Sequence, residues 1–182
     1  LWNKGEGGTA AVICGNGNNG GDGYVVAGLL AQAGFSVAVI DAMGKPKPPD
    51  AAFFEEKLQA EPVRRFVTGK AEPRIFSLLE DADVIFDAVF GTGFHGRLPA
   101  EIAAVFRAAN RSDALRVALD IPSGAGCAAE PDAFCADVTL TFSALKPVHV
   151  TLPGRARCGR VEVLPIGIPA FVMREQPHQG EM

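Results

Sequence analysis

Short apolar runs alternate with longer segments of helical character along most of the chain. The first run, Thr9–Cys14, contains β-branched residues and ends at a glycine-rich stretch, which is typical of a strand buried on both faces. Apolar helix formers fill residues 22–33, Gly34 stands where a helix would end, and Ser36–Asp41 forms a second apolar run. Strand, helix and strand in this order require a right-handed crossover, so we expect parallel strands.

The same alternation continues toward the C-terminus. Further helices are predicted at residues 50–60, within 73–80 and at 99–110, and further strands at 64–67, 84–88, 115–120, 138–142 and 160–163. Proline and glycine crowd the chain between and after the last two strands, which favours turns over helices there. The pattern predicts a Rossmann-like, doubly wound α/β fold: a mostly parallel sheet with helices on both faces, in three layers.

Length and composition indicate one globular domain. The 182 residues are expected to form a single domain with a core at about 9–170 and a loose tail at 171–182. Apolar residues make up 48% and charged residues 21%, which excludes a mainly disordered chain. No apolar run reaches the roughly 18 residues of a membrane span. The net charge of -4 argues against general binding of nucleic acids.

Cysteine usage favours a reducing compartment. The four cysteines form no C-x-x-C pair, so a disulfide scaffold or a zinc finger is a weak hypothesis and a cytoplasmic location is expected. The three histidines likewise lack zinc-ligand spacing. The chain begins with Leu1 rather than Met, as expected of a fragment.

The ends of the predicted strands carry the candidate chemistry, because ligands of doubly wound sheets bind there. Residues 15–23 contain five glycines, which permit positive φ angles and close approach of backbone amides, so this stretch predicts an anion-binding turn. Gly15, Gly17 and Gly20 also fit G-x-G-x-x-G, with Asp41 where a dehydrogenase places its ribose-binding acid. The plainer alternative is a tight turn capped by Asp22.

Asp87 is a carboxylate within an apolar predicted strand. Burial of a carboxylate is costly without compensation, so either a cation or hydrogen bonds from nearby loop amides should lie beside it. A metal ion and Arg97 are the candidate cations. The glycine-rich segment 91–97 follows directly and offers a second surface lined with amides.

Two later strand ends add candidate side chains. Asp120 ends the strand predicted at 115–120, where a general acid or base would meet a substrate, and Ser123 offers a neutral oxygen to a cation or a hydroxyl group. A turn cap is the alternative role for Asp120. Lys146 follows the strand predicted at 138–142, where it would either contact phosphate or remain solvated.

Five blocks together resemble one enzyme family. The similarity to the YjeF N-terminal domain, the NAD(P)H-hydrate epimerase family, runs from about Ala10 to Pro169 and rests on Asn18 to Gly23, Asp87 with Gly91-Thr92-Gly93, Leu119 to Gly124, Lys146-Pro147 and Gly167-Ile168-Pro169. The resemblance implies an isomerase that interconverts the R and S forms of hydrated NADH and NADPH, so that a partner dehydratase specific for the S form can repair both. It also implies a homodimer.

The resemblance implies site residues as well. A potassium ion would be held by Asn19, Asp87 and Ser123, with backbone carbonyls completing its shell. The substrate contacts that it implies are Asn18, Asn19, Gly20, Gly21, Asp22, Gly91, Thr92, Gly93, Phe94, His95, Gly96, Arg97 and Asp120.

A chemical hypothesis follows for Asp120. The hydrated cofactor carries a hydroxyl group next to a ring nitrogen, and protonation lets that group leave as water while the nitrogen lone pair stabilises a planar cation. Water then returns on either face. Asp120 is the candidate general acid and base, and as an acid it would have to hold a proton near neutral pH.

Two departures from the family pattern and two alternative functions accompany this hypothesis. Ala125-Gly126-Cys127 follows the Pro-Ser-Gly motif, where the family usually continues with Leu and Asp, and the family's Glu-Asn-Ala-Gly segment ahead of the first strand is missing from this sequence. The alternatives are a non-catalytic nucleotide-binding or interaction module of the same fold, and an NAD-dependent oxidoreductase in which Asp41 selects the ribose.

Overall fold

The strands stand where the apolar runs predict them. A computed structural model describes residues 7–69, 72–127 and 130–167. Its seven strands are β1 Thr9–Cys14, β2 Ser36–Asp41, β3 Arg64–Val67, β4 Val84–Ala88, β5 Leu115–Leu119, β6 Val138–Phe142 and β7 Arg160–Leu164. Its helices are α1 Asn18–Gln32, α2 Pro49–Leu58, α3 Glu72–Glu80, α4 Ala100–Ala109, α5 Pro147–Val150 and the 3-10 helix η1 Gly154–Arg157.

All seven strands are parallel and form one sheet in the order β3-β2-β1-β4-β5-β6-β7. This is the doubly wound arrangement that the alternation of elements predicts. The order reverses between β1 and β4, so the chain leaves these two neighbouring strands in opposite directions across the sheet. Such a reversal leaves a crevice beyond the carboxyl ends of the two strands, where ligands of this architecture bind.

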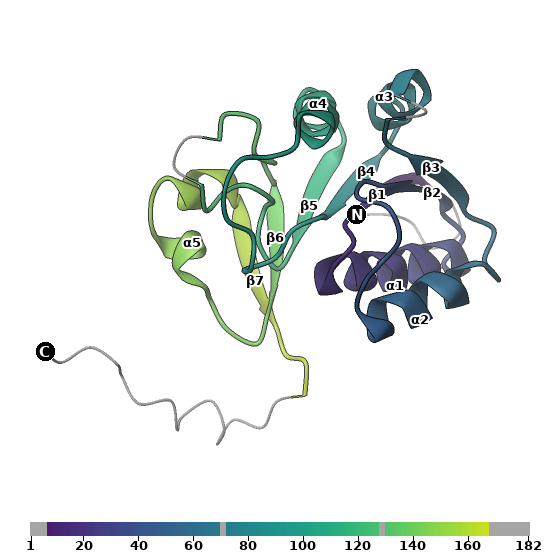
Figure 1. Ribbon diagram of the computed structural model, residues 1–182, viewed down its shortest axis with the longest axis horizontal. Coiled ribbons are helices and arrows are strands. Elements are labelled where there is room, and N and C mark those ends of the chain that lie inside the picture. The colour runs from purple at the N-terminus through teal and green to yellow at the C-terminus, as the bar shows by residue number, and fades with distance from the viewer. Residues whose placement is uncertain (1–6, 70–71, 128–129, 168–182) are drawn as a thin grey trace, which may run out of the picture.

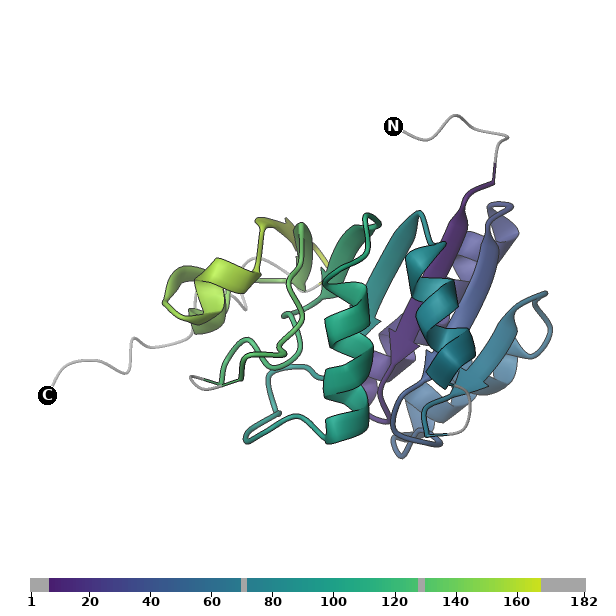
Figure 2. The same ribbon diagram turned by 90° about the horizontal axis from the view of Figure 1, so that it is seen from above.

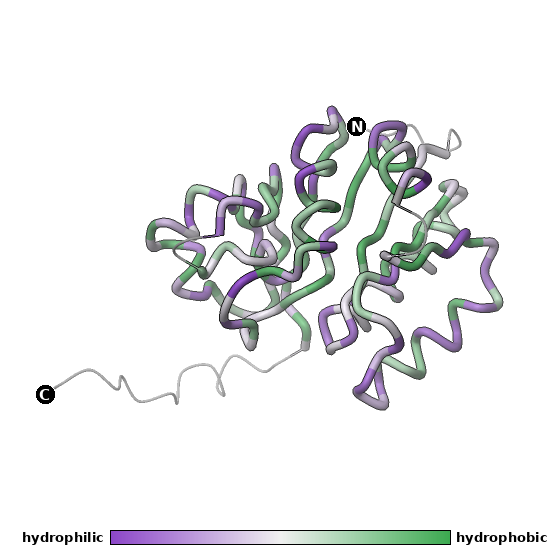
Figure 3. Tube along the Cα trace, turned by 45° about the horizontal axis from the view of Figure 1, so that its top comes forward, coloured by the Kyte–Doolittle hydropathy of each residue, from purple (hydrophilic) through white to green (hydrophobic). Residues whose placement is uncertain are grey.

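Helices cover both faces of the sheet and give the three predicted layers (Figures 1 and 2). Helices α1 and α2 pack together on one face and α3 and α4 on the other. Side chains alternate along β1: Ile13 packs in the core cluster of α3 and α4, whereas Val12 packs in that of α1 and α2. Because both faces are buried, the central strands β1, β2 and β4 are mostly apolar, whereas the edge strands β3 and β7 are more exposed and carry charged residues. Figure 3 shows hydrophobic segments between hydrophilic turns. None of the described helices has the length and apolar character needed to cross a bilayer.

Helix α1 begins earlier than the sequence predicts. It starts at Asn18 with Gly17 as its N-cap, so Asp22 lies inside the helix and the tight turn capped by Asp22 is wrong. The glycines of this segment have no positive φ. They permit close packing instead: a Cβ at Gly20 would lie 2.0 Å from the carbonyl oxygen of Gly15, and one at Gly23 would lie 2.6 Å from Cβ of Ala88. The glycines thus seat α1 tightly against the ends of β1 and β4.

Two other details differ from the prediction. Strand β5 ends at Leu119, and Asp120 turns away from it with a φ of 64°. The segment expected to contain only turns holds α5 and η1, because Pro147 occupies the first helical position, where a missing N–H breaks no helical hydrogen bond. Ile168, Pro169 and the predicted tail at 171–182 lie outside the described residues.

Candidate active site

A cavity of about 420 Å³ lies at the point where the strand order reverses. The start of α1, the segment after β4 and single residues after β5 and at the end of β6 line it. The lining residues are Asn16, Gly17, Asn18, Asn19, Asp22, Val89, Phe90, Gly91, Thr92, Gly93, Phe94, Asp120 and Phe142. The sequence blocks after three different strands are therefore brought together, as the topology requires.

The two glycine-rich segments face each other across this cavity. The amide of Asn19 donates from Nδ2 to the carbonyl oxygen of Phe90, at 3.1 Å, and joins α1 to the segment after β4. A Cβ at Gly91 would lie 3.8 Å from Cβ of Asn19 and 3.9 Å from Oδ2 of Asp120. The absence of a side chain at Gly91 thus keeps the space between these two residues open.

Asp87 is fully buried on β4 and is held by hydrogen bonds. Oδ2 accepts from the backbone N–H of Ser123 at 2.7 Å, and Oδ1 accepts from the Ser123 hydroxyl at 2.7 Å and from the N–H of Val89 at 3.1 Å. Among the described residues no ion pair joins Arg97 to Asp87, so loop amides and a hydroxyl compensate the carboxylate. Burial nevertheless dominates and raises the pKa of Asp87 to about 6, while the three hydrogen bonds lower it.

Oxygen atoms gather beside this carboxylate. Asn19 is buried, and within the part of the chain that the structure describes its Oδ1 has no hydrogen-bond partner. The hydroxyl of Ser123 lies 2.9 Å from the backbone nitrogen of Phe90 and 3.4 Å from its carbonyl oxygen. Asn19 and Ser123 both contact the backbone of Phe90, and Ser123 in turn contacts Asp87, so this connected group of buried oxygen atoms suits a hard monovalent cation. The described residues contain no cluster of three His, Cys, Asp or Glu side chains, which a transition metal would favour.

Asp120 forms an ion pair at the edge of the cavity. Nζ of Lys146 lies 2.5 Å from its Oδ1, and the Thr141 hydroxyl donates to the same oxygen at 3.1 Å. Lys146 also donates to Oγ1 of Thr141 and to the carbonyl oxygen of Phe142. Oδ2 of Asp120 has no hydrogen bond from any described residue. One oxygen of Asp120 is thus anchored while the other remains available for a ligand.

Asp22 supplies a second carboxyl group to the cavity. The residue is exposed as a whole, yet partial desolvation of its carboxyl group, and next the charge of Asp120, raise its pKa. Asp22 is thus a second group in the cavity that could hold a proton, and its pKa lies above the ordinary value.

Most of the predicted substrate contacts meet in this cavity, and some do not. Gly20 and Gly21 are buried in α1 and serve its packing against Gly15 and Ala51. His95 lines a neighbouring cavity of about 290 Å³, and Gly96 and Arg97 line neither of the two. The predicted contacts that do line the main cavity are Asn18, Asn19, Asp22, Gly91, Thr92, Gly93, Phe94 and Asp120.

Sequence reasoning missed several residues of the site. Phe90 and Phe142 line the cavity, and the Phe90 ring stacks on Phe94 with their centroids 3.9 Å apart. Lys146, considered as a phosphate contact or a solvated residue, instead binds Asp120. The sequence signal for Phe90 and Phe142 is their place at the ends of β4 and β6, but the pairing of Lys146 depends on tertiary structure.

Asp41 is already engaged on the protein side. Arg65 donates to both of its carboxylate oxygens, at 2.9 to 3.1 Å, and the hydroxyl of Tyr24 donates to Oδ1 at 2.9 Å. The residue is buried. Asp41 is therefore not presented to a ribose, as the oxidoreductase alternative requires.

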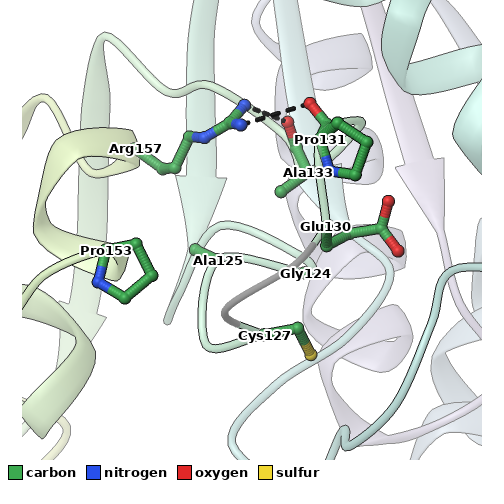
Figure 4. A pocket seen from close by; sticks show the side chains of 8 residues that line it. All are labelled: Gly124, Ala125, Cys127, Glu130, Pro131, Ala133, Pro153 and Arg157. Carbon is green, nitrogen blue, oxygen red and sulfur yellow. Dashed lines mark hydrogen bonds between the residues drawn. The ribbon is translucent and has the colours of Figure 1, made fainter.

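A third cavity, of about 340 Å³, lies beside the segment that departs from the family pattern (Figure 4). Arg157 borders it and donates to the carbonyl oxygens of Ala133 and Pro131, at 3.1 and 3.2 Å. Ala125 and Cys127 line this cavity and not the main one. The unusual residues after Gly124 thus lie outside the lining of the main cavity.

Comparison with protein families and known proteins gives one consistent result. The family model described as YjeF-related protein N-terminus matches residues 2–148. The NAD(P)H-hydrate epimerase of Rhodopirellula baltica is 37% identical over 172 residues, which cover 92% of this chain and 70% of that protein. The bifunctional NAD(P)H-hydrate repair enzyme Nnr of Escherichia coli is 35% identical over 171 residues, but this chain spans only 32% of its length. The crystal structure of yeast ynu0 shares the fold with a TM-score of 0.71 at 21% identity, covering 91% of this chain and 69% of that one.

Proposed function

We propose that this chain, which belongs to the family of YjeF-related protein N-termini, is an NAD(P)H-hydrate epimerase. It interconverts the R and S forms of hydrated NADH and NADPH. The observation that carries this proposal is Asp120, whose Oδ2 is free at a cavity built from both glycine-rich segments, while Oδ1 is anchored by Lys146.

The cavity suits a hydrated dinucleotide. Backbone amides at the start of α1 and after β4 offer hydrogen bonds to the pyrophosphate, and the positive end of α1 favours its negative charge. The rings of Phe90 and Phe142 offer apolar surface to the flat groups of the cofactor. We place the substrate contacts at the predicted residues that line the cavity, with Asn16, Phe90 and Phe142 added to them.

The reaction needs a proton delivered to the leaving hydroxyl group and later withdrawn from incoming water. Oδ2 of Asp120 is the group that we assign to both transfers. The carboxyl group of Asp22 in the same cavity, with its raised pKa, is a local reservoir for the proton. Departure of water leaves a planar cation on the substrate, and addition to its opposite face gives the other epimer.

Buried oxygen atoms next to the cavity would hold a potassium ion. Oδ1 of Asn19, the carboxylate of Asp87 and the hydroxyl of Ser123 would bind it, together with the carbonyl oxygen of Phe90. Such an ion would supply a fixed positive charge that favours binding of the negatively charged substrate. Asp87 and Ser123 already hold each other in place by hydrogen bonds, so these two buried ligands are ordered by protein contacts.

The test is chromatographic. Purified protein receives the R form of NADH hydrate, in potassium and then in sodium buffer, and appearance of the S form is compared with a heat-inactivated sample. We expect acceleration that is greater in potassium. Binding of the hydrate without acceleration would favour the non-catalytic module instead.

The proposed activity implies a functional partner. An epimerase serves a dehydratase that acts on one epimer, and the bifunctional relatives, about three times as long as the matched region, are named as repair enzymes. We propose a separate or fused NAD(P)H-hydrate dehydratase as functional partner, a homodimer as assembly and the cytoplasm as compartment.

A further inference from the structure

Asp120 has a backbone conformation that needs support. Its φ of 64° lies in the left-handed region, which is unfavourable for residues with a side chain, although Asp tolerates it better than most. On one side its N–H donates to the carbonyl oxygen of Leu140, the last residue of β6 that pairs with β5, at 2.8 Å. On the other side its carbonyl oxygen lies 2.9 Å from Nε2 of His149.

His149 can support this conformation because it is buried and both of its ring nitrogens form hydrogen bonds. Only 2% of the residue is exposed. The backbone N–H of Lys146 donates to Nδ1 at 3.0 Å, so Nδ1 is an acceptor. A neutral imidazole then carries its proton on Nε2, and this nitrogen donates to the carbonyl oxygen of Asp120. Burial lowers the pKa of His149, which favours this neutral form.

The ring therefore joins the two segments that supply the ion pair. Asp120 follows β5, and Lys146 precedes α5 after the chain has left β6 at Phe142. The pairing of β5 with β6 ends at Leu119 and Leu140, so the sheet itself does not fix the backbone of Lys146 relative to Asp120. The imidazole makes that connection with one hydrogen bond to each backbone.

We infer that His149 is a positioning residue that sets the backbone of Asp120 and of Lys146 so that their carboxylate and ammonium meet at the cavity. The inference rests on the proposed function, in which Asp120 transfers the proton. His149 lines neither the main cavity nor the neighbouring one and contributes no atom to the reaction.

Three variants separate the two hydrogen bonds. His149→Leu removes both, His149→Asn keeps an acceptor near the position of Nδ1, and His149→Gln keeps a donor near the position of Nε2. We expect His149→Leu and His149→Asn to lower kcat about tenfold or more, with KM changed less than about twofold, because misplacement of a reacting group by about 1 Å slows the chemical step. His149→Gln should restore kcat to within about threefold of the unmodified protein.

The outcomes distinguish the inference from the proposed function. If the unmodified protein does not accelerate epimerisation, both the proposed function and the inference are contradicted. If it does and His149→Leu retains its kcat, or His149→Gln and His149→Asn are impaired equally, only the inference falls. Should His149→Leu fail to fold, the comparison of Gln with Asn decides. Long-range ¹H–¹⁵N NMR of the unmodified protein tests the geometry without turnover: a proton on Nε2 supports it, and one on Nδ1 overturns it.

Discussion

Nζ of Lys146 lies 2.5 Å from Oδ1 of Asp120, across 26 residues of sequence. The ammonium is also held by Thr141 and by the carbonyl oxygen of Phe142, so its position does not depend on the carboxylate alone. Lys146 therefore fixes which oxygen of Asp120 faces the cavity.

Removal of this ammonium should slow epimerisation more than it weakens binding. Lys146→Met leaves Asp120 with Thr141 as its only side-chain partner, and we expect kcat to fall about 10- to 100-fold with KM within about threefold. Steady-state chromatography of R-form NADH hydrate measures both constants. Lys57→Met, on α2, is the matched control. Equal kcat for Lys146→Met and the unmodified protein would contradict the role assigned to the ion pair.

Replacement of Asp120 by Asn should separate chemistry from binding. The amide keeps the shape of the carboxyl group but cannot transfer the proton, so we expect a loss of about 100- to 10,000-fold in kcat. The dissociation constant of the hydrated cofactor, measured by calorimetry, should change less than about fivefold. Retained turnover would remove Asp120 from its role and direct attention to Asp22.

Asp87 should make stability depend on pH in buffer without potassium. Its pKa is about 6 in the folded protein, above the ordinary 3.8, so the folded state holds the proton more strongly than the unfolded state. The free energy of unfolding should therefore fall as pH rises from about 4 to about 6, by a contribution of about 3 kcal/mol, and remain lower above that range.

Urea denaturation of the unmodified protein and Asp87→Asn across this range measures the effect. The difference between the two curves isolates the contribution of Asp87, and parallel curves would contradict it. Potassium should raise the midpoint more at pH 7.5 than at pH 5, because the cation and the proton compete for the same carboxylate. A potassium effect independent of pH would argue against Asp87 as a ligand.

Asp41 should matter for stability and not for catalysis. Asp41→Asn leaves Arg65 with Glu55 as its remaining carboxylate partner and weakens the bond to Tyr24. We expect the free energy of unfolding to fall by about 2–4 kcal/mol, since one partner of a largely buried ion pair is lost. The KM for the hydrated cofactor should stay within about twofold. A large rise in KM with unchanged stability would revive the dehydrogenase-like role.

Gly20 and Gly17 offer a matched pair of substitutions at the start of α1. A Cβ at Gly20 would clash with the carbonyl oxygen of Gly15, whereas one at Gly17 would point into open space. Gly20→Ala should lower the free energy of unfolding by about 1–3 kcal/mol and Gly17→Ala by about 0.5 kcal/mol. Thermal denaturation tests this order, and equal effects would contradict the packing role of Gly20.

The sequence predicts the sheet well because the central strands are short apolar runs between turn-forming residues. All seven predicted strands form, and the residues after β1, β4 and β5 meet because parallel strands end at one edge. The start of α1 was not predictable in the same way. Glycine lowers helix propensity, so Asn18 to Gly21 suggests a loop, and only tight packing against Gly15 and Ala88 makes a helix favourable there.

The contacts between side chains of the site also could not be predicted from the sequence. The hydrogen bonds to Asp87 are those of the Val89 amide and of Ser123, which follows β5 and lies beside Asp87, and no local sequence pattern specifies this contact. The bond between Lys146 and Asp120 depends on a turn after Phe142 that no local pattern specifies. The potassium ligands and the catalytic role of Asp120 stay predictions until the experiments above are made.

Because the strand order reverses between β1 and β4, the two walls of the binding cavity come from distant parts of the chain. One wall comes from the segment before Gly23 and the other from segments after Val84, with β2, α2, β3 and α3 between them in sequence. Neither half of the polypeptide could grip a dinucleotide by itself. A bound dinucleotide would thus contact both halves at once, and its binding free energy would add to the free energy needed to separate or unfold them.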